Sequence, residues 1–553
     1  MRIAVLGMLA ACGHHSTTSE LAKTGAPALH AIDPVQLEAN TKYLSSDELA
    51  GRAPGSEGGA KAEQYVADQF AKLGLQPAGE GGTYFQTVPL REAILDAARS
   101  SLVVHAKAGD VELVHGKDAV LVADPHSADV AIDAPLVFVG YGISTAGYDD
   151  LAGLDLHGAI AVVFGGAPRS LAGKPLDASL HAVLADVKKR SVDLRAHGAS
   201  AMLVIYDPAR AQRMSFAKYV TKVFASSMAW LDHGEVGSLP VLPMTALSDT
   251  ALDRVLGDGK THALWEKLDR GERVQVDLAA TASLRVRAQL RDVTARNVAA
   301  LLPGSDPALA AETVVYSAHL DHLGLGPPVD GDSIYNGALD DAIGVAGIIE
   351  MARGFVALPQ HPKRSLLFLA VTAEEKGLLG SDYFAAHPTI PLARIVADIN
   401  IDGLSPLYEE YDMLPLGAEH STLAAHAEAA AHATGYVLSP DPDPDQVFFI
   451  RSDQYSFVER GVPSVFPNAG WRDANGDTAA YKAISDKWAA EHYHQPSDVW
   501  RPEYNAAWAA KEAGFDVLFG LSVANAPERP RWNPGDAFAN TASQEPTAGV
   551  TGR

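Results

Sequence analysis

Residues 313–344 decide the fold: they open with 313-TVVYSAHLDHLG-324 and close with 336-NGALDDAIG-344. The first run starts as a strand at 313–317, and the second leads into a helix near 342–356. Two more apolar runs, 366-LLFLAV-371 and 395-IVADINI-401, precede expected helices near 376–387 and 420–434. Continuous apolar strands that alternate with helices are typical of a sheet covered on both faces. The sequence therefore predicts an α/β fold with a mixed central sheet flanked by helices.

Polar motifs stand at the carboxyl ends of these strands, where open α/β sheets carry their sites. In chain order they are 318-AHLDHLG-324, 336-NGALDDAIG-344, 372-TAEEKG-377, 398-DINIDG-403 and 491-EHYHQPSD-498. Zinc binds histidine nitrogen and carboxylate oxygen, and a two-metal site needs a carboxylate that bridges ions roughly 3.5–4 Å apart. Each motif alone also fits a solvated surface, an acidic helix start or a helix N-cap. All five in one α/β context favour a metal site.

Three acidic residues invite more specific roles. Asp321 stands two residues beyond His319, and a carboxylate there is a candidate to hold the second ring nitrogen of a metal-binding histidine. The neighbours Glu374 and Glu375 can divide the work, because one can bind metal while the other moves a proton. Cys12 is the single cysteine of the chain, so a cysteine-rich zinc site is excluded.

The ordered set of motifs closely resembles that of the zinc exopeptidases typified by bacterial leucyl aminopeptidases. Two early stretches, 49-LAGRAPGS-56 and 74-GLQPAG-79, also look like the first part of that family's peptidase domain, and 529-RPRWNPG-535 is familiar from the same group. Residues 130–245 resemble the protease-associated domain that is inserted in many members. The resemblance implies the zinc exopeptidase fold, a phosphorylase/hydrolase-like sheet, with a β-rich insert.

The resemblance also implies two Zn²⁺ ions per chain and a ligand for each position of the family's motifs. Asp340 is expected to bridge both ions. His319 and Asp402 then complete one site, and Glu375 and His494 complete the other. The peptide bond that follows Asp340 is typically cis in this family.

In the implied reaction, Glu374 is the general base on a zinc-bridging water, and the expected substrates are peptides with a free N-terminus. Three alternatives remain: a carboxypeptidase or dipeptidase of the same fold, a glutaminyl-cyclase-like enzyme with one zinc, and a binding module that has lost catalysis. The number of zinc ions per chain separates the last two from the first. The sequence carries no signal for the oligomeric state.

Changes in composition, together with clusters of glycine and proline, divide the chain into expected segments. We expect a signal peptide with a lipobox at 1–12, a polar tether at 13–30, and the first part of the peptidase domain at 31–105. The inserted protease-associated domain is expected at 106–288, the second part of the peptidase domain, with the metal site, at 289–526, and a loosely ordered tail at 527–553. The insert should contain one amphipathic helix at about 183–197.

The N-terminus and the charge balance limit location and partners. The stretch 9-LAAC-12 resembles the bacterial lipobox, in which the cysteine is lipidated after cleavage, and a basic start and an apolar run precede it. We therefore expect an exported protein, a periplasmic or cell-envelope lipoprotein of a bacterium or else a secreted protein, held at a membrane only through Cys12. The formal net charge of −24 argues against a nucleic acid partner.

Overall fold

The computed structural model describes residues 9–145, 148–171, 173–220, 226–237, 242–274 and 276–539. The chain forms two compact units. The first unit consists of Met1–Val88, Thr294–Pro442 and Arg451–Arg553, and the second of Pro89–Val293 and Asp443–Ile450. Among the described residues, no helix has the length and apolar character needed to cross a membrane.

The sheet of the first unit is mixed and centres on β17 (Thr313–His319). This strand runs parallel to β20 (Ser365–Val371) on one side and to β21 (Ile395–Asn400) on the other. β20 pairs antiparallel with the end of β16 (Ala280–Leu302), and β21 runs parallel to β24 (Ser464–Ala469), which pairs antiparallel with β22 (Asp412–Leu416). The register of β17 against β20 pairs Thr313 with Ser365 and His319 with Val371, so both strands end at one edge.

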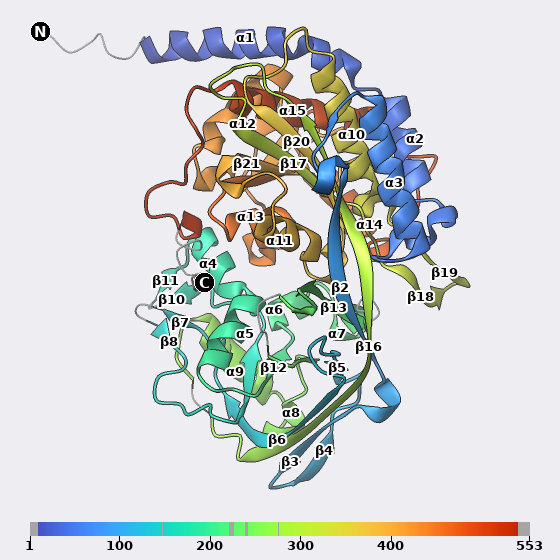
Figure 1. The fold of residues 1–553 in the computed structure, drawn as a ribbon. Coiled ribbons are helices and arrows are strands. Elements are labelled where there is room, and N and C mark those ends of the chain that lie inside the picture. Colours follow the sequence, from blue (N-terminus) through green and yellow to red (C-terminus); the bar gives the residue numbers. More distant parts are fainter. Residues whose placement is uncertain are drawn as a thin grey trace, which may run out of the picture. The chain divides into compact units, whose positions relative to one another are not determined.

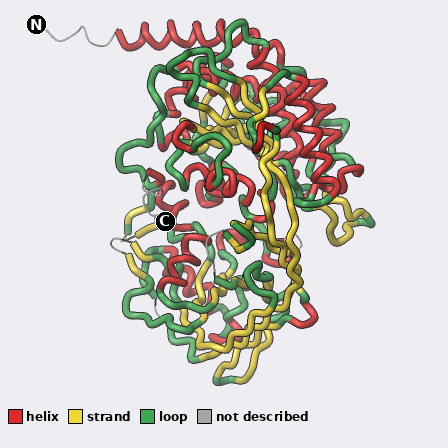
Figure 2. Tube along the Cα trace, viewed as in Figure 1, coloured by secondary structure: helices red, strands yellow, loops and turns green. Residues whose placement is uncertain are grey.

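Helices cover both faces of this sheet. Because successive side chains of a strand point to opposite faces, alternate residues of β17 pack in two different cores. Val314 and Tyr316 pack in the core that includes α2 (Pro34–Leu44), α3 (Glu57–Lys72), α10 (Ile343–Val356), α12 (Leu423–Thr434) and α15 (Ala506–Asn525). Val315 packs with Phe384 of α11 (Leu379–Ala386) and Phe457 of α13 (Gln454–Val458) on the other face. Figures 1 and 2 show this layering in the first unit. The predicted fold class is confirmed.

The shorter elements of the first unit lie around this framework. They are β1 (Gln76–Pro77), the hairpin β18 (Gly324–Val329) and β19 (Asp332–Tyr335), β23 (Val437–Leu438) and α14 (Ala479–Glu491). β2 (Phe85–Leu95) begins in this unit and continues into the second, as β16 begins in the second and ends in the first.

The second unit is rich in short strands. β9 (Ile160–Phe164) runs parallel to β12 (Ala201–Ile205) and β6 (Asp129–Phe138), and the start of β16 pairs with β3 (Ser101–Ala106). The other strands are β4 (Gly109–Glu112), β5 (Ala119–Leu121), β7 (Ser144–Thr145), β8 (Tyr148–Asp149), β10 (Ser170–Leu171), β11 (Lys174–Pro175), β13 (Ser226–Asp232), β14 (Glu235–Val236) and β15 (Met244–Leu247). Its helices are α4 (Ala178–Ala185), α5 (Val187–Ala196), α6 (Pro208–Ala211), α7 (Phe216–Val220), α8 (Asp253–Leu256) and α9 (Lys260–Asp269).

Two details of the second unit differ from expectation. The helix expected at 183–197 is two helices, because Asp186 ends α4 and caps α5 by accepting from the backbone amides of Lys188 and Lys189. The unit also starts earlier than the expected insert, at Pro89, since β2 pairs with β13 from Leu90 onward. Its identity as a protease-associated domain stays a prediction.

Both ends of the chain are more ordered than expected. Residues 13–30, expected as a tether, are helical within α1 (Leu9–Ala31), which packs against α10, α12 and α15 and buries Ala28. The expected loose tail is folded as far as residue 539, with Trp532 Nε1 donating to the Gly461 carbonyl at 3.0 Å and Phe538 buried. Residues 1–8 of the expected signal peptide and 540–553 of the tail lie outside the described residues.

Candidate metal centre

The strands of the first unit bring the five expected ligands to one edge of the sheet. His319 is the last residue of β17, Glu375 follows β20, and Asp402 follows β21. Asp340 lies in the turn before α10, and His494 comes just after α14. Because β17, β20 and β21 are parallel, their carboxyl ends meet at this edge.

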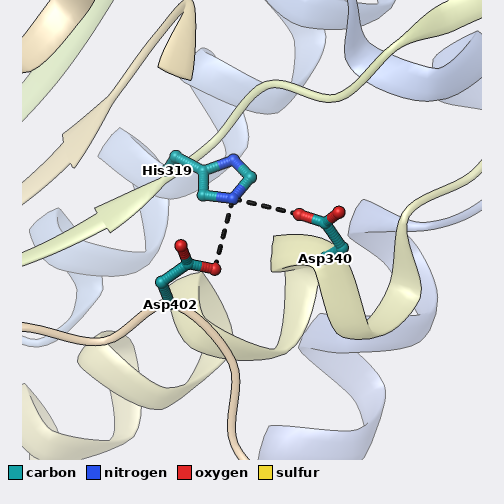
Figure 3. Close-up of side chains that lie close together, drawn as sticks. All are labelled: His319, Asp340 and Asp402. Atoms are coloured by element: carbon teal, nitrogen blue, oxygen red, sulfur yellow. Dashed lines mark ion pairs between the residues drawn. The ribbon is translucent and has the colours of Figure 1, made fainter. Parts of the chain in front are cut away.

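One group of ligand atoms surrounds His319, which is buried (Figure 3). Its Nε2 lies 3.1 Å from Oδ1 of Asp340 and 3.5 Å from Oδ1 of Asp402. Ligands bound to zinc at about 2.0–2.2 Å in a tetrahedron stand about 3.3–3.6 Å apart. These atoms can therefore hold one metal ion.

A second group forms on the other oxygen of Asp340. His494 Nε2 lies 3.2 Å from Oδ2 of Asp340 and 3.2 Å from Oε2 of Glu375. Although Oδ2 of Asp340 is buried and faces this imidazole, it makes no hydrogen bond among the described residues. Asp340 thus directs its two oxygens to two ligand groups, which is the arrangement that a bridging carboxylate requires.

Glu374 belongs to neither group. Its Oε2 comes only to 4.0 Å from Nε2 of His319, and its side chain is 13% exposed. Burial raises the pKa of Glu374 well above its ordinary value, and the neighbouring carboxylates of Glu375 and Asp402 raise it further, against the opposing effect of His319.

His322 is a residue of the site for which the sequence reasoning assigned no role. It is fully buried, and its Nδ1 lies 2.7 Å from Oε1 of Glu375 and 4.0 Å from Oδ2 of Asp340. Neither Nδ1 of His322 nor Oε1 of Glu375 makes a hydrogen bond within the described residues, and the ligand atoms of His322, Asp340 and Glu375 lie close enough together to hold a metal ion. The sequence feature that could have identified His322 is its place as the second histidine of 318-AHLDHLG-324, three residues after His319.

Asp321 has a different role from the expected one. The second nitrogen of His319, Nδ1, lies 3.1 Å from the backbone carbonyl oxygen of Asp321, not from its carboxylate. The carboxylate instead accepts from the backbone amides of Glu374 at 3.0 Å and Glu375 at 3.4 Å. The loop after β17 turns the side chain toward the loop after β20, and burial raises the pKa of Asp321 to about 6. The carboxylate of Asp321 therefore holds the backbone of Glu374 and Glu375 in place.

Two more buried aspartates hold the other loops in the same way. The Asp341 carboxylate accepts from the amides of His319 at 3.2 Å and Gly403 at 2.7 Å. The Asp498 carboxylate accepts from the amide of Asp340 at 3.2 Å. The peptide bond between Asp340 and Asp341 is cis, as the resemblance implied. Each loop that carries an expected ligand is thus tied to another loop through a carboxylate.

The donor set suits zinc. Imidazole nitrogens and carboxylate oxygens are the ligands it takes when no thiolate is present. The carboxylates of Asp340, Glu374, Glu375 and Asp402 lie together at a largely buried edge, so their mutual repulsion favours bound cations.

Comparisons with known proteins agree with this geometry. Residues 297–517 match the model of peptidase family M28. A probable leucine aminopeptidase 2 of Aspergillus oryzae is 31% identical over 204 residues, which are 36% of this chain and 37% of that protein. A probable zinc metalloprotease of Pyrenophora tritici-repentis is 39% identical over 75 residues, which are 14% of this chain and 17% of that protein. The chain thus spans little more than a third of the first of these relatives and less of the second.

The fold also matches a solved structure over nearly its whole length. The aminopeptidase from Aneurinibacillus sp. strain AM-1 superposes with a TM-score of 0.53 at 20% identity, covering 92% of this chain and 98% of that one. At this level of identity the match supports the fold.

Proposed function

We propose that this chain, whose residues 297–517 match the model of peptidase family M28, is a zinc aminopeptidase that removes N-terminal amino acids from peptides. One observation carries the proposal: the two oxygens of Asp340 face two separate groups of ligands, while Glu374 stands outside both. A single-zinc enzyme has no need of such a bridging carboxylate.

Under this proposal, Asp340 would be a ligand of both zinc ions. His319 and Asp402 would hold one ion, and Glu375 and His494 the other. Bound zinc supplies Lewis acidity, which polarises the scissile carbonyl and lowers the pKa of water. His322, whose Nδ1 lies 2.7 Å from Oε1 of Glu375, would be a further candidate ligand of the second ion.

Glu374 is proposed to move the proton. Its carboxylate would accept a proton from the attacking water and deliver it to the leaving amine, which is general base and then general acid catalysis by one group. The raised pKa of Glu374 suits this cycle, because a base that is too acidic does not retain the proton long enough to pass it on. Asp321 would hold the backbone of Glu374 in place during the cycle.

The choice of an aminopeptidase over other peptidases has chemical support. A free N-terminus offers an amine nitrogen, and nitrogen is a donor that zinc accepts, so one of the two ions would bind the substrate's α-amine. A substrate blocked at its N-terminus lacks this donor.

A panel of aminoacyl and peptide substrates, free or blocked at the N-terminus, tests the proposal. Purified chain with two zinc ions should hydrolyse the free substrates and spare the blocked ones, and a chelator should abolish the activity until zinc is restored. Equal cleavage of blocked substrates would contradict aminopeptidase activity. One zinc per chain with cyclisation of N-terminal glutamine would favour the cyclase alternative, and no zinc would favour a binding module.

A further inference from the structure

We propose that Arg52 is a positioning residue that ties the two loops carrying His319 and Asp340 to each other and thereby sets the affinity of the metal centre. The inference rests on the proposed function, since it concerns the same two-metal site. Arg52 lies far from these loops in sequence, in the stretch 49-LAGRAPGS-56, and its side chain is fully buried.

The guanidinium of Arg52 donates to four backbone carbonyls. Nε donates to Leu320 at 2.9 Å, and Nη2 donates to Gly337 at 3.0 Å. Nη1 donates to both Leu44 and Asn336 at 2.6 Å. All four acceptors are backbone carbonyl oxygens, so these contacts fix the path of the backbone.

These carbonyls belong to the two loops that carry His319 and Asp340 and to the end of a helix. Leu320 follows His319 directly, and Gly337 precedes Asp340 by three residues. Leu44 is the last residue of α2, so the guanidinium joins both ligand loops to a helix that packs against α10. A guanidinium is planar and presents its N–H groups in a fixed fork, which a lysine ammonium cannot reproduce.

The backbone around Arg52 is built to place this group. Gly51 has a φ of 71° and Arg52 a φ of 50°, a conformation that only tight local packing maintains for a non-glycine residue. A Cβ on Gly51 would lie 2.4 Å from the Tyr335 carbonyl oxygen and 2.7 Å from that of Gly324. The turn therefore packs directly on the β18–β19 hairpin, which connects the two ligand loops.

Charge makes this burial tolerable. Burial lowers the pKa of Arg52, and the carboxylates of Asp321, Asp341 and Asp498 oppose that effect. These are the same carboxylates that hold the backbone amides of the ligand loops. Arg52 holds carbonyls of the loops while the aspartates hold their amides, and the positive and negative groups compensate each other.

The test compares Arg52→Lys with Arg190→Lys in the full chain. Arg190 of the second unit is a matched control, because it is also buried and donates to the carbonyls of Phe164, Gly166 and Leu184. The readouts are zinc affinity by competition with a chromophoric chelator, the thermal midpoint of the zinc-free protein, and kcat and KM. Lysine keeps the charge and removes the fork, so the comparison isolates geometry.

We expect both variants to lower the thermal midpoint, but only Arg52→Lys to weaken zinc binding, by about 10–100-fold, with a larger fall in kcat than rise in KM. A zinc affinity within twofold of wild type, or an equal loss in Arg190→Lys, would overturn the inference. If the wild-type chain itself binds no zinc, the proposed function fails instead.

A second measurement avoids mutation and decides the matter if Arg52→Lys does not fold. Binding at one place stabilises whatever is coupled to it, so zinc added to the wild-type chain should slow amide exchange in residues 44–52 as well as in the ligand loops. Unchanged exchange in 44–52 would overturn the inference.

Discussion

Glu374 and Glu375 are neighbours in the chain, yet their carboxyl groups have opposite surroundings. Glu375 meets an imidazole on each oxygen, His322 at 2.7 Å and His494 at 3.2 Å. Burial raises the pKa of Glu375, but these imidazoles outweigh burial and leave it well below its ordinary value. Burial dominates at Glu374 and raises its pKa. A pair of carboxyl groups whose pKa values are pushed apart is a good basis for assigning one as ligand and the other as base.

Substitution of each glutamate by glutamine separates the two roles. Glu374→Gln should keep two zinc ions per chain and lower kcat by about 10²–10⁴-fold, because it removes proton transfer and leaves the ligands in place. Glu375→Gln should lose zinc, because an amide is a poor ligand. Metal analysis of both variants beside hydrolysis rates checks this. Wild-type rates in Glu374→Gln, or loss of zinc from it, would refute the division of roles.

The residues of the candidate metal centre could be predicted from the sequence in part. All six residues expected as ligands or base lie at one edge, because they stand at or near the ends of parallel strands and in the loops that meet there. His322 was overlooked because one histidine in 318-AHLDHLG-324 already satisfied the motif. The role of Asp321 could not be read, since only the path of the loop decides whether its carbonyl or its carboxylate faces His319.

The start of α10 shows how closely the elements around the site approach one another. The Gly344 amide donates to Oδ1 of Asp341 at 2.9 Å. A Cβ on Gly344 would lie 2.1 Å from that oxygen and 2.3 Å from the backbone oxygen of Ile401, which precedes Asp402. The helix therefore rests directly on the loop that carries an expected ligand.

Gly344→Ala should disturb this contact, because backbone atoms cannot move aside cheaply. We expect a loss of about 1–3 kcal/mol in stability and weaker zinc binding. Gly347→Ala on the same helix is the control: its Cβ would meet the end of the Leu404 side chain at 2.6 Å, which can rotate, and alanine favours the helix. Thermal unfolding and zinc titration compare the two. A larger effect from Gly347→Ala would contradict the close approach.

Elements with a continuous apolar pattern were predicted well, and those that depend on tertiary contacts were not. β17, β20 and β21 begin within one residue of the strands expected from the sequence. α1 was expected as a tether because its segment is polar, and its packing against α10 and α15 lies outside any local pattern. The division between α4 and α5 likewise depends on one capping residue, Asp186.

In the whole molecule, the buried acids of the first unit link stability to pH. Burial raises the pKa of Glu410 to about 7, and its carboxylate accepts a hydrogen bond from Tyr436. The folded state thus holds a proton between pH 4.5 and about 7 that the unfolded chain releases. Stability from this group is highest below pH 4.5 and falls as pH rises through that window.

Glu410→Gln should flatten this fall, because glutamine cannot ionise yet still accepts from Tyr436. Between pH 5 and pH 8 the variant should gain up to about 3 kcal/mol relative to wild type. Chemical unfolding at a series of pH values measures it, and Glu419→Gln, whose side chain is 59% exposed, controls for the loss of one carboxylate. A parallel fall in variant and wild type would contradict the assignment.

The second unit includes a short piece of chain from within the peptidase sequence. Residues Asp443–Ile450 belong to it, with Asp443 2.6 Å from Arg213 and Asp445 3.4 Å from Arg169. A graft that replaced only 89–293 by a linker would leave this piece without its partners. Exchange of the unit between relatives therefore has to transfer both pieces, with recombination points at 88/89, 293/294, 442/443 and 450/451.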